Sequence, residues 1–373
     1  MNLKEYNKFR DPERIVLKDL KKNPILNFVI PAWEEENDID RNITALLNLN
    51  YPKYKIIINA GKEKTYSRIK SYKEKFEKTL DTSKNNIKRE FILLKQEGKG
   101  KLHAVNRCLD YVEKGIVAFI DFDTNITEEY VYRHVYEIVN NNKKVVVCAI
   151  RPYENQKDLT LPKYITIFRN RDFYRKFERE LSKDVFLRSG CFFIDYEFIK
   201  NGGKFNDKII GSECYYQGSE LARRGYKIYQ LKHPEAHIKT DYPKKLKEYF
   251  NQMVKFYENK LISKVSKKRT IRQIISQFLL FLVSLTFFAS VILSFFHLFF
   301  LILLVLILES FYLKRIRTVI FYSYTENKRY DFDLDIVFYL SIFVYIVVEL
   351  LVNIYSIIEF VFFSKKIKQK KNI

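Results

Sequence analysis

The sequence predicts an α/β domain, with a mainly parallel sheet and helices on both of its faces, followed by C-terminal transmembrane helices. Short apolar runs alternate with segments of helical periodicity between residues 25 and 262, which is typical of β-α-β units. Polar motifs follow several of these runs, where ligands bind in such sheets. In residues 274–313, by contrast, only His297 and Glu309 can carry a charge near neutral pH, which indicates a membrane-spanning part.

Five strands and four helices are expected to alternate in the α/β domain. The strand segments are short and rich in Ile, Val, Phe and Leu, and the helical segments repeat their apolar residues every three or four positions. The expected strands are 26–31, 55–59, 90–94, 116–121 and 144–150. The expected helices are 38–49, 65–80, 102–111 and 127–139.

Charge and hydropathy assign the rest of the chain. The first 24 residues are crowded with charged side chains and contain no apolar run, so they do not form a signal peptide. Basic clusters flank residues 274–313, which predicts a helical hairpin with both ends in the cytoplasm. Basic residues also follow 336–363, so the charge pattern does not decide on which side of the membrane the C-terminal tail lies. The expected segments are a charged N-terminal segment (1–24), the α/β domain (25–262), a basic juxtamembrane segment (263–273), two transmembrane helices (274–313), a cytoplasmic loop (314–335), a third transmembrane or re-entrant helix (336–363) and a basic tail (364–373).

The net charge and the cysteine spacing limit which partners and which cellular location are expected. The formal net charge is +22, but lysine is spread throughout and no zinc-finger or helix-turn-helix spacing occurs, so nucleic acid is not expected as a partner. Anionic membrane lipids account for the basic clusters beside the apolar segments. No two of the four cysteines have the C-x-x-C spacing. This pattern is typical of a protein that has no structural zinc site and lies in a reducing compartment. We therefore expect a multi-pass protein of the cell membrane with a cytoplasmic α/β domain.

The most informative motif is a D-x-D, Asp121 and Asp123, at the end of the apolar run 116–120. Residues two apart on an extended strand face the same way, so both carboxylates are expected to point at one place. Such a pair can hold Mg²⁺ or Mn²⁺, which take their remaining ligands from water and phosphate oxygens. The alternative is that Asp123 only caps the helix that follows.

Further motifs, in order along the chain, share the spacing of one enzyme family. They are P-A-W-E-E at 31–35, G-K-L-H-A-V-N at 100–106, S-G-C at 189–191, Glu213 with G-Y-K-I twelve residues later at 225–228, and Q-M-V-K-F at 252–256. Together with the D-x-D, this series resembles glycosyltransferase family 2, whose catalytic domain is the nucleotide-diphosphosugar-binding GT-A fold. The resemblance covers residues 25 to 260.

The resemblance implies a membrane-anchored, metal-assisted, inverting glycosyltransferase. The donor would be a nucleotide-diphosphosugar, the acceptor a lipid-linked sugar or a glycan, and the cofactor Mg²⁺ or Mn²⁺. It implies catalytic roles for Glu213 and Cys214 and metal ligation by Asp123 and Asp121. It implies nucleotide-sugar binding by Pro31, Glu35, Asn59, Lys101, Asn106, Asp121 and Lys255, and acceptor binding by Ser189, Gly190, Gln252 and Phe256.

Three departures from the family's pattern matter. Cys214 stands where the family usually has the aspartate that acts as base, so either Glu213 is the base or the enzyme is impaired; Glu220, on the same expected helix, is the next candidate. Asn59-Ala60-Gly61-Lys62 replaces the usual acidic residues after the second strand, which leaves the base specificity open. The usual Arg and Trp of the last motif are Lys255 and Phe256.

Two other functions are compatible with the sequence. One is a processive polysaccharide synthase, which the number of expected spans allows. The other is a catalytically inactive membrane scaffold that keeps the GT-A fold, which the cysteine at 214 would suit. The D-x-D and Lys101 argue against the scaffold.

Overall fold

The computed structural model describes residues 15–35, 39–82, 88–98, 100–122, 124, 126–147, 149–152, 187, 191–207, 213–231, 237–240, 243, 245–262 and 297–307, with isolated positions between 275 and 293 and between 348 and 355. The chain divides into two compact units. The first comprises Met1–Arg151 and Glu180–Thr240, and the second comprises Pro152–Arg179 and Asp241–Ile373.

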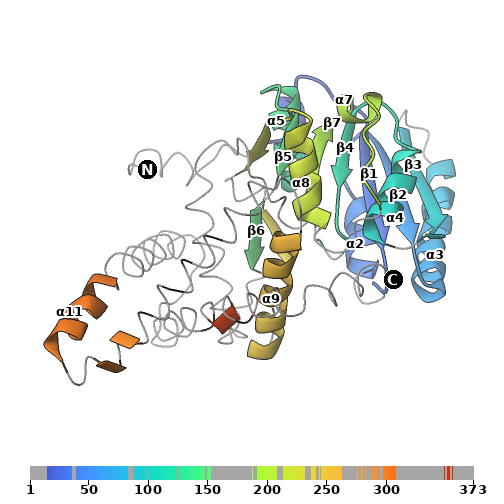
Figure 1. Ribbon diagram of the computed structural model, residues 1–373. Helices are drawn as coiled ribbons and strands as arrows, with labels where there is room; N and C mark the ends of the chain where they lie inside the picture. Colours follow the sequence, from blue (N-terminus) through green and yellow to red (C-terminus); the bar gives the residue numbers. More distant parts are fainter. Residues whose placement is uncertain are drawn as a thin grey trace. The chain divides into compact units, whose positions relative to one another are not determined.

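A seven-stranded sheet forms the centre of the first unit (Figure 1). Its strands lie in the order β3-β2-β1-β4-β7-β5-β8. The pairs β1–β2, β1–β4, β2–β3 and β5–β8 are parallel, whereas β7 is antiparallel to both of its neighbours. The strands are β1 (Leu26–Ala32), β2 (Lys53–Ala60), β3 (Lys88–Lys95), β4 (Ile116–Phe119), β5 (Val145–Val147), β7 (Phe192–Asp195) and β8 (Ile228–Gln230). The predicted α/β class with a mostly parallel sheet is confirmed.

The helices cover both faces of this sheet, as predicted. On one face, α2 (Ile39–Leu47), α3 (Glu63–Thr82) and α5 (Glu128–Val139) contribute to a single apolar cluster with β1, β2 and β4. On the other face, α4 (Lys101–Leu109), α7 (Glu197–Lys200) and α8 (Glu213–Arg223) contribute to a second cluster. All but one of the described positions of β2 are buried, because a parallel sheet covered on both faces needs apolar residues throughout rather than in alternation.

One expected strand is wrong in its extent. The run 144–150 forms two strands in different sheets: β5 belongs to the large sheet, and β6 (Ala149–Pro152) pairs with β9 (His237–Thr240) in a two-stranded sheet. A continuous apolar run does not reveal where a strand changes its partner, because both halves are equally suited to burial. The expected strand 116–121 also ends early, at Phe119.

The N-terminus of α5 answers the capping question that the sequence left open. The side chain of Thr127 accepts a hydrogen bond from the backbone N–H of Tyr130 at 3.2 Å, so Thr127 is the N-cap. The helix therefore does not need Asp123 as its cap.

The described part of the second unit is mainly helical. It contains α9 (Leu246–Ile262) and the wholly apolar α11 (Leu298–Ile307). Within the part of the chain that the structure describes, no helix has both the length and the hydropathy needed to cross a membrane. The predicted spans 274–313 and 336–363 lie largely outside the described residues.

Candidate active site

A pocket of about 580 Å³ lies where β1, β3 and β4 end. This volume is within the usual range of small-molecule sites, and the place is where open α/β sheets bind ligands. Four of the residues predicted to bind the nucleotide-sugar line it, namely Pro31, Glu35, Lys101 and Asp121. They come from three different segments of the sequence, and the fold brings them together in one pocket.

Lys101 and Asp121 form an ion pair in this pocket. The Lys101 Nζ lies 2.5 Å from Asp121 Oδ1, and the two side chains are 29% and 23% exposed. Lys101 is the first residue of α4 and follows Gly100, whose φ of 93° is one that L-residues rarely adopt. Burial by itself would lower the pKa of the Lys101 ammonium, but the carboxylate of Asp121, together with Cys214 and Glu213, raises it above the ordinary value. The ammonium is therefore a permanent positive charge in the pocket.

Glu213 and Cys214, at the start of α8, lie close enough to Lys101 to interact with its charge. Burial raises the pKa of the Cys214 thiol to about 12, against the opposing effect of Lys101. A thiol with this pKa stays protonated near neutral pH and cannot act as a general base. Of the two adjacent residues, Glu213 is thus the one with a suitable group.

Glu220, the other candidate base, is engaged elsewhere. Its carboxylate accepts hydrogen bonds from Arg223 at 2.7 and 2.9 Å and from Arg224 at 2.8 Å, and the residue is 6% exposed. The hydrogen bond from Arg223, helped by Arg224, holds the pKa of this carboxyl below its ordinary value. Glu220 therefore belongs to an ion-pair network on α8.

The turn that carries Asp121 is held from several sides. Ile120 N–H still donates to Val29 O at 3.1 Å, as a strand residue would, but Asp121 N–H donates to Cys191 Sγ at 3.3 Å. This change of partner is the reason why β4 ends before the D-x-D. Thr124 Oγ1 lies 3.2 Å from the same sulfur atom, and Thr124 N–H donates to Asp121 O at 3.0 Å. A buried thiol thus fixes both ends of the turn.

The chemistry of this site fits a hard divalent cation. Asp121 offers carboxylate oxygen to the pocket, and Mg²⁺ is usually held by one or two carboxylates plus water and phosphate oxygens. Asp123, the other predicted ligand, lies outside the described residues. Among the residues that are described, no three His, Cys, Asp or Glu side chains form a cluster that could hold a metal by themselves. A metal here would share Asp121 with Lys101.

Two of the predicted nucleotide-binding residues are used inside the protein. Asn59 is 1% exposed, and its Nδ2 donates to Ala104 O at 3.3 Å, which ties β2 to α4. Asn106 exchanges two hydrogen bonds with the backbone of Phe205, at 2.6 and 2.9 Å. Neither side chain lines the pocket. Their polar character serves contacts between elements.

The remaining predicted residues are placed only in part. Gln252 is an exposed residue of α9, in the second unit. Lys255 and Phe256 belong to the same helix, but their side chains lie outside the described part of the structure. Ser189 and Gly190 also lie outside the described residues. Their roles stay predictions.

Trp33 is a pocket residue that was not selected from the sequence. Its indole is 50% exposed and lines the pocket, with Lys62 Nζ 5.3 Å from the ring centroid. Lys62 also pairs with Glu34 at 3.2 Å, and both of these residues have left-handed φ angles, 55° and 56°. The indole lies directly against Gly61, where a Cβ would come within 2.0 Å of the ring. Trp33 is the only tryptophan of the chain and stands within the first motif, which was the available signal.

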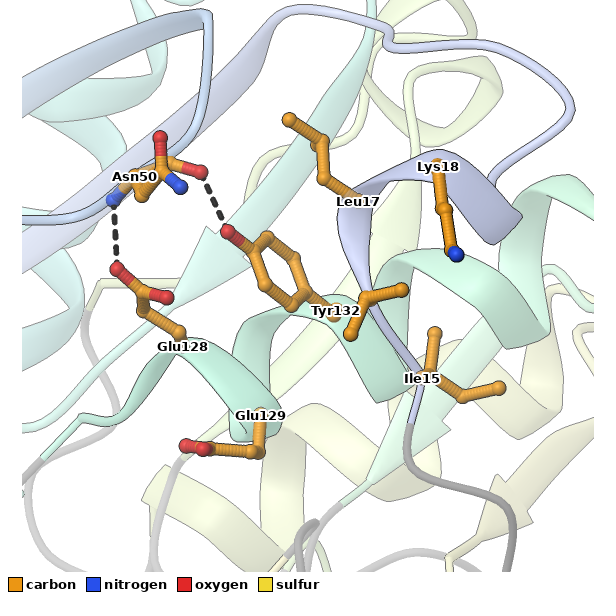
Figure 2. A pocket seen from close by; sticks show the side chains of 8 residues that line it. Ile15, Leu17, Lys18, Asn50, Glu128, Glu129 and Tyr132 are labelled. Carbon is orange, nitrogen blue, oxygen red and sulfur yellow. Dashed lines mark hydrogen bonds between the residues drawn. The ribbon is translucent and has the colours of Figure 1, made fainter.

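Three residues of a second pocket, Asn50, Glu128 and Tyr132, are joined by hydrogen bonds. This pocket, of about 270 Å³, lies between the N-terminal segment and α5 (Figure 2). Asn50 N–H donates to Glu128 Oε1 at 3.1 Å, and Tyr132 Oη donates to Asn50 O at 2.5 Å (Figure 2). Burial, with Glu128, raises the pKa of Tyr132 to about 12. None of the predicted site residues lines this pocket.

Comparison with protein families gives two overlapping matches. The family Glycosyl transferase family 2 matches residues 27–201, and Glycosyl transferase family group 2 matches residues 116–352, which is more than half of the chain. The search of curated proteins found no match.

Several solved structures are similar at low sequence identity. The mannosyltransferase PcManGT from Pyrobaculum calidifontis, in complex with GDP-Man and Mn²⁺, is 15% identical with a TM-score of 0.47, over 69% of this chain and 68% of that one. S. aureus TarS 1-349 is 13% identical with a TM-score of 0.44, over 67% and 72% of the two chains. The same TarS fragment in complex with UDP-GlcNAc is 14% identical with a TM-score of 0.42, over 66% and 70%.

Proposed function

The chain belongs to Glycosyl transferase family group 2 and is a glycosyltransferase, and we propose that it transfers a sugar from a nucleotide-diphosphosugar to a hydroxyl group with inversion at the anomeric carbon. The observation that carries this proposal is the Lys101–Asp121 ion pair in the pocket, with Glu213 and Cys214 beside it. A cation, a carboxylate for a metal and a second carboxylate for a proton are the groups that this reaction needs.

The donor would occupy the pocket where β1, β3 and β4 end. The exposed indole of Trp33 offers a flat apolar surface on which a nucleobase or a sugar ring can stack. The N-terminus of α4 and the Lys101 ammonium favour an anion such as the diphosphate. Pro31 and Glu35 complete this side of the pocket.

Asp121, with Asp123 as the second predicted ligand, would hold Mg²⁺ or Mn²⁺ on the diphosphate side. When bound, such an ion neutralises the negative charge that develops on the leaving diphosphate. Lys101 adds a permanent positive charge at the same place, since its pKa is raised above the ordinary value. The site thereby favours departure of the nucleoside diphosphate.

Glu213 would act as the general base. As the acceptor oxygen attacks the anomeric carbon, the carboxylate of Glu213 takes the hydroxyl proton, and the bond from that carbon to the diphosphate oxygen breaks with its electron pair leaving on the diphosphate. The Cys214 thiol remains protonated throughout, because its pKa is about 12. This assignment makes the cysteine at the usual aspartate position compatible with an active enzyme and disfavours the inactive scaffold.

The acceptor would be a lipid-linked sugar or a glycan at the cytoplasmic face of the cell membrane. In the second unit, Leu298, Phe299 and Ile302 of α11 are 69%, 59% and 53% exposed, and all ten residues of this helix are apolar. A helix that is apolar all round is suited to lipid rather than to water. This supports the placement of 274–313 in the membrane; the placement of 336–363 there, and the contact of the basic clusters with anionic lipids, are part of the same proposal.

A donor panel with two adjacent variants tests the proposal. Full-length protein in lipid nanodiscs would be incubated with UDP-, GDP- and dTDP-sugars and with a lipid-linked sugar or a glycan as acceptor, in Mn²⁺ or in EDTA, and release of nucleoside diphosphate measured. Glu213→Gln should lower kcat by a factor on the order of 10²–10⁴ and leave donor affinity within about threefold. Glu77→Gln, on the exposed surface of α3, is the matched control and should keep full activity.

Two results would refute the proposal. One is that no nucleotide-sugar is consumed under any of these conditions. The other is that Glu213→Gln retains the full kcat, which would remove the base from the mechanism.

A further inference from the structure

We propose that Asn106 is a positioning residue, which holds the start of α8, and with it Glu213, in place relative to Lys101. The inference rests on the proposed function, in which Glu213 is the base. Asn106 belongs to the motif 100–106, and the resemblance implied that it binds the nucleotide-sugar. Its contacts assign it a different task.

Asn106 clamps the backbone of a residue 99 positions further along the chain. Its Nδ2 donates to Phe205 O at 2.6 Å, and Phe205 N–H donates to its Oδ1 at 2.9 Å. Both polar ends of the amide are thus engaged by one residue, which leaves the side chain turned toward that segment and not among the residues that line the pocket. The reciprocal pair fixes the segment's position and its direction.

The clamped segment, Lys204–Asn206, lies between α4 and α8 and is attached to both. Toward α4, Lys204 Nζ pairs with Asp110 at 2.5 Å. Toward α8, Asn206 N–H donates to Tyr216 Oη at 3.2 Å, and Arg224 Nη2 donates to Lys204 O at 3.1 Å. The last two bonds are made near opposite ends of α8, so the segment sets the orientation of that helix.

Phe205 anchors the segment in the core. The residue is 3% exposed, and its ring lies 5.3 Å from Phe198 and 5.9 Å from Phe119, measured between centroids. The chain reaches it through Gly203, where a Cβ would come within 2.2 Å of Phe198 O. Phe119 ends β4, two residues before Asp121. The segment is therefore packed against β4, the strand that leads to Asp121.

Loss of this clamp should disturb the reaction more than it disturbs binding. Lys101 begins α4 and lies on the donor side, whereas Glu213 begins α8 and must reach the acceptor hydroxyl. A displacement of a catalytic group by about 1 Å can cost on the order of a hundredfold in rate. A residue that acts through Glu213 lowers kcat, whereas a residue that touches the nucleotide raises its dissociation constant.

The chain offers a matched control for the clamp. Asn27 makes the same reciprocal pair with the backbone of Glu113, through Nδ2 to Glu113 O at 3.0 Å and Glu113 N–H to Oδ1 at 3.2 Å. It lies at the beginning of β1, at the opposite end of that strand from Pro31 and the pocket. Asn27→Ala removes this pair, together with a further bond from Nδ2 to Ile116 O at 3.3 Å, without touching the α4–α8 junction.

The experiment compares Asn106→Ala with Asn27→Ala in the full-length protein. The measurements are kcat for sugar transfer, the dissociation constant of the nucleoside diphosphate, and Tm. We expect both variants to lower Tm, and only Asn106→Ala to lower kcat, by about 10- to 100-fold, with a dissociation constant within about threefold of wild type. Should Asn106→Ala fail to fold, the isosteric Asn106→Asp, which keeps the acceptor for Phe205 N–H, is measured in its place.

A double-mutant cycle with Glu213→Gln gives the decisive reading. If Asn106 acts through the base, Asn106→Ala should lower kcat by less than about threefold once Glu213 is Gln, because coupled residues are not additive. Full multiplication of the two losses would overturn the inference. So would a tenfold weaker nucleotide affinity with normal kcat, or an equal loss of kcat in Asn27→Ala. Full kcat in Glu213→Gln alone would instead refute the proposed base, and the inference with it.

Discussion

The protonated thiol of Cys214 gives a sharp test of the chemistry at the start of α8. With its pKa at about 12, roughly one molecule in 10⁴ carries a thiolate at pH 8, whereas a cysteine with the ordinary pKa of 9.0 would be about one-tenth ionised. Because the thiolate is the nucleophile, alkylation of Cys214 by iodoacetamide at pH 8 should be about 10³-fold slower than that of a free thiol. Peptide mass spectrometry after timed labelling measures this rate at the single residue.

A second variant distinguishes a thiol that is rarely ionised from a thiol that the reagent cannot reach. The Asp121 carboxylate helps to raise the pKa of Cys214, so Asp121→Asn should lower that pKa and speed the labelling, whereas a thiol that is merely covered would not respond. In the transfer reaction, Cys214→Ser should keep kcat within about threefold, and kcat should not rise tenfold per pH unit above pH 7. Labelling as fast as that of a free thiol, together with an inactive Cys214→Ser, would refute the reasoning and make the cysteine the base.

Two further predictions concern stability and donor binding. Burial lowers the pKa of His134 to about 4, from an ordinary value near 6.5. The folded state therefore binds fewer protons than the unfolded state below pH 6.5, so acid favours unfolding. The free energy of unfolding, measured by urea denaturation, should fall by about 2 kcal/mol between pH 7.5 and pH 5. His134→Gln should lose this dependence, and an unchanged pH profile in the variant would contradict the assignment. Trp33→Ala should weaken nucleoside diphosphate binding by about tenfold or more, and Trp33→Phe by less, as measured by calorimetry. In the wild type, the fluorescence of this single tryptophan should change on binding, and equal affinities for all three proteins would exclude a stacking role.

The sequence predicted the fold and part of the site for identifiable reasons. The first three strands each contain a short run of apolar residues, and β1 begins at its expected residue and ends one residue beyond its expected end. The ion pair of Lys101 and Asp121 joins two motifs that each follow a strand of the parallel sheet, so the topology alone brought them together.

The parts that were not foreseen depend on contacts across the fold. β7 is a four-residue antiparallel strand inserted between β4 and β5, and nothing in its composition shows that position. Asn59 and Asn106 were both predicted to bind the nucleotide-sugar, but their hydrogen-bond partners, Ala104 and Phe205, are visible only in three dimensions. A polar residue near a site serves either the ligand or the fold, and spacing does not separate the two.

The contact between Trp33 and Gly61 means that the width of the pocket is decided by a residue that does not line it. Any side chain at position 61 would occupy the space of the indole, since even a Cβ would come within 2.0 Å of the ring. A larger side chain at position 61 would displace the Trp33 indole without changing any residue that lines the pocket. Exchange of Gly61 is therefore a route by which evolution or design could alter which donors fit, while Lys101, Asp121 and Glu213 stay as they are.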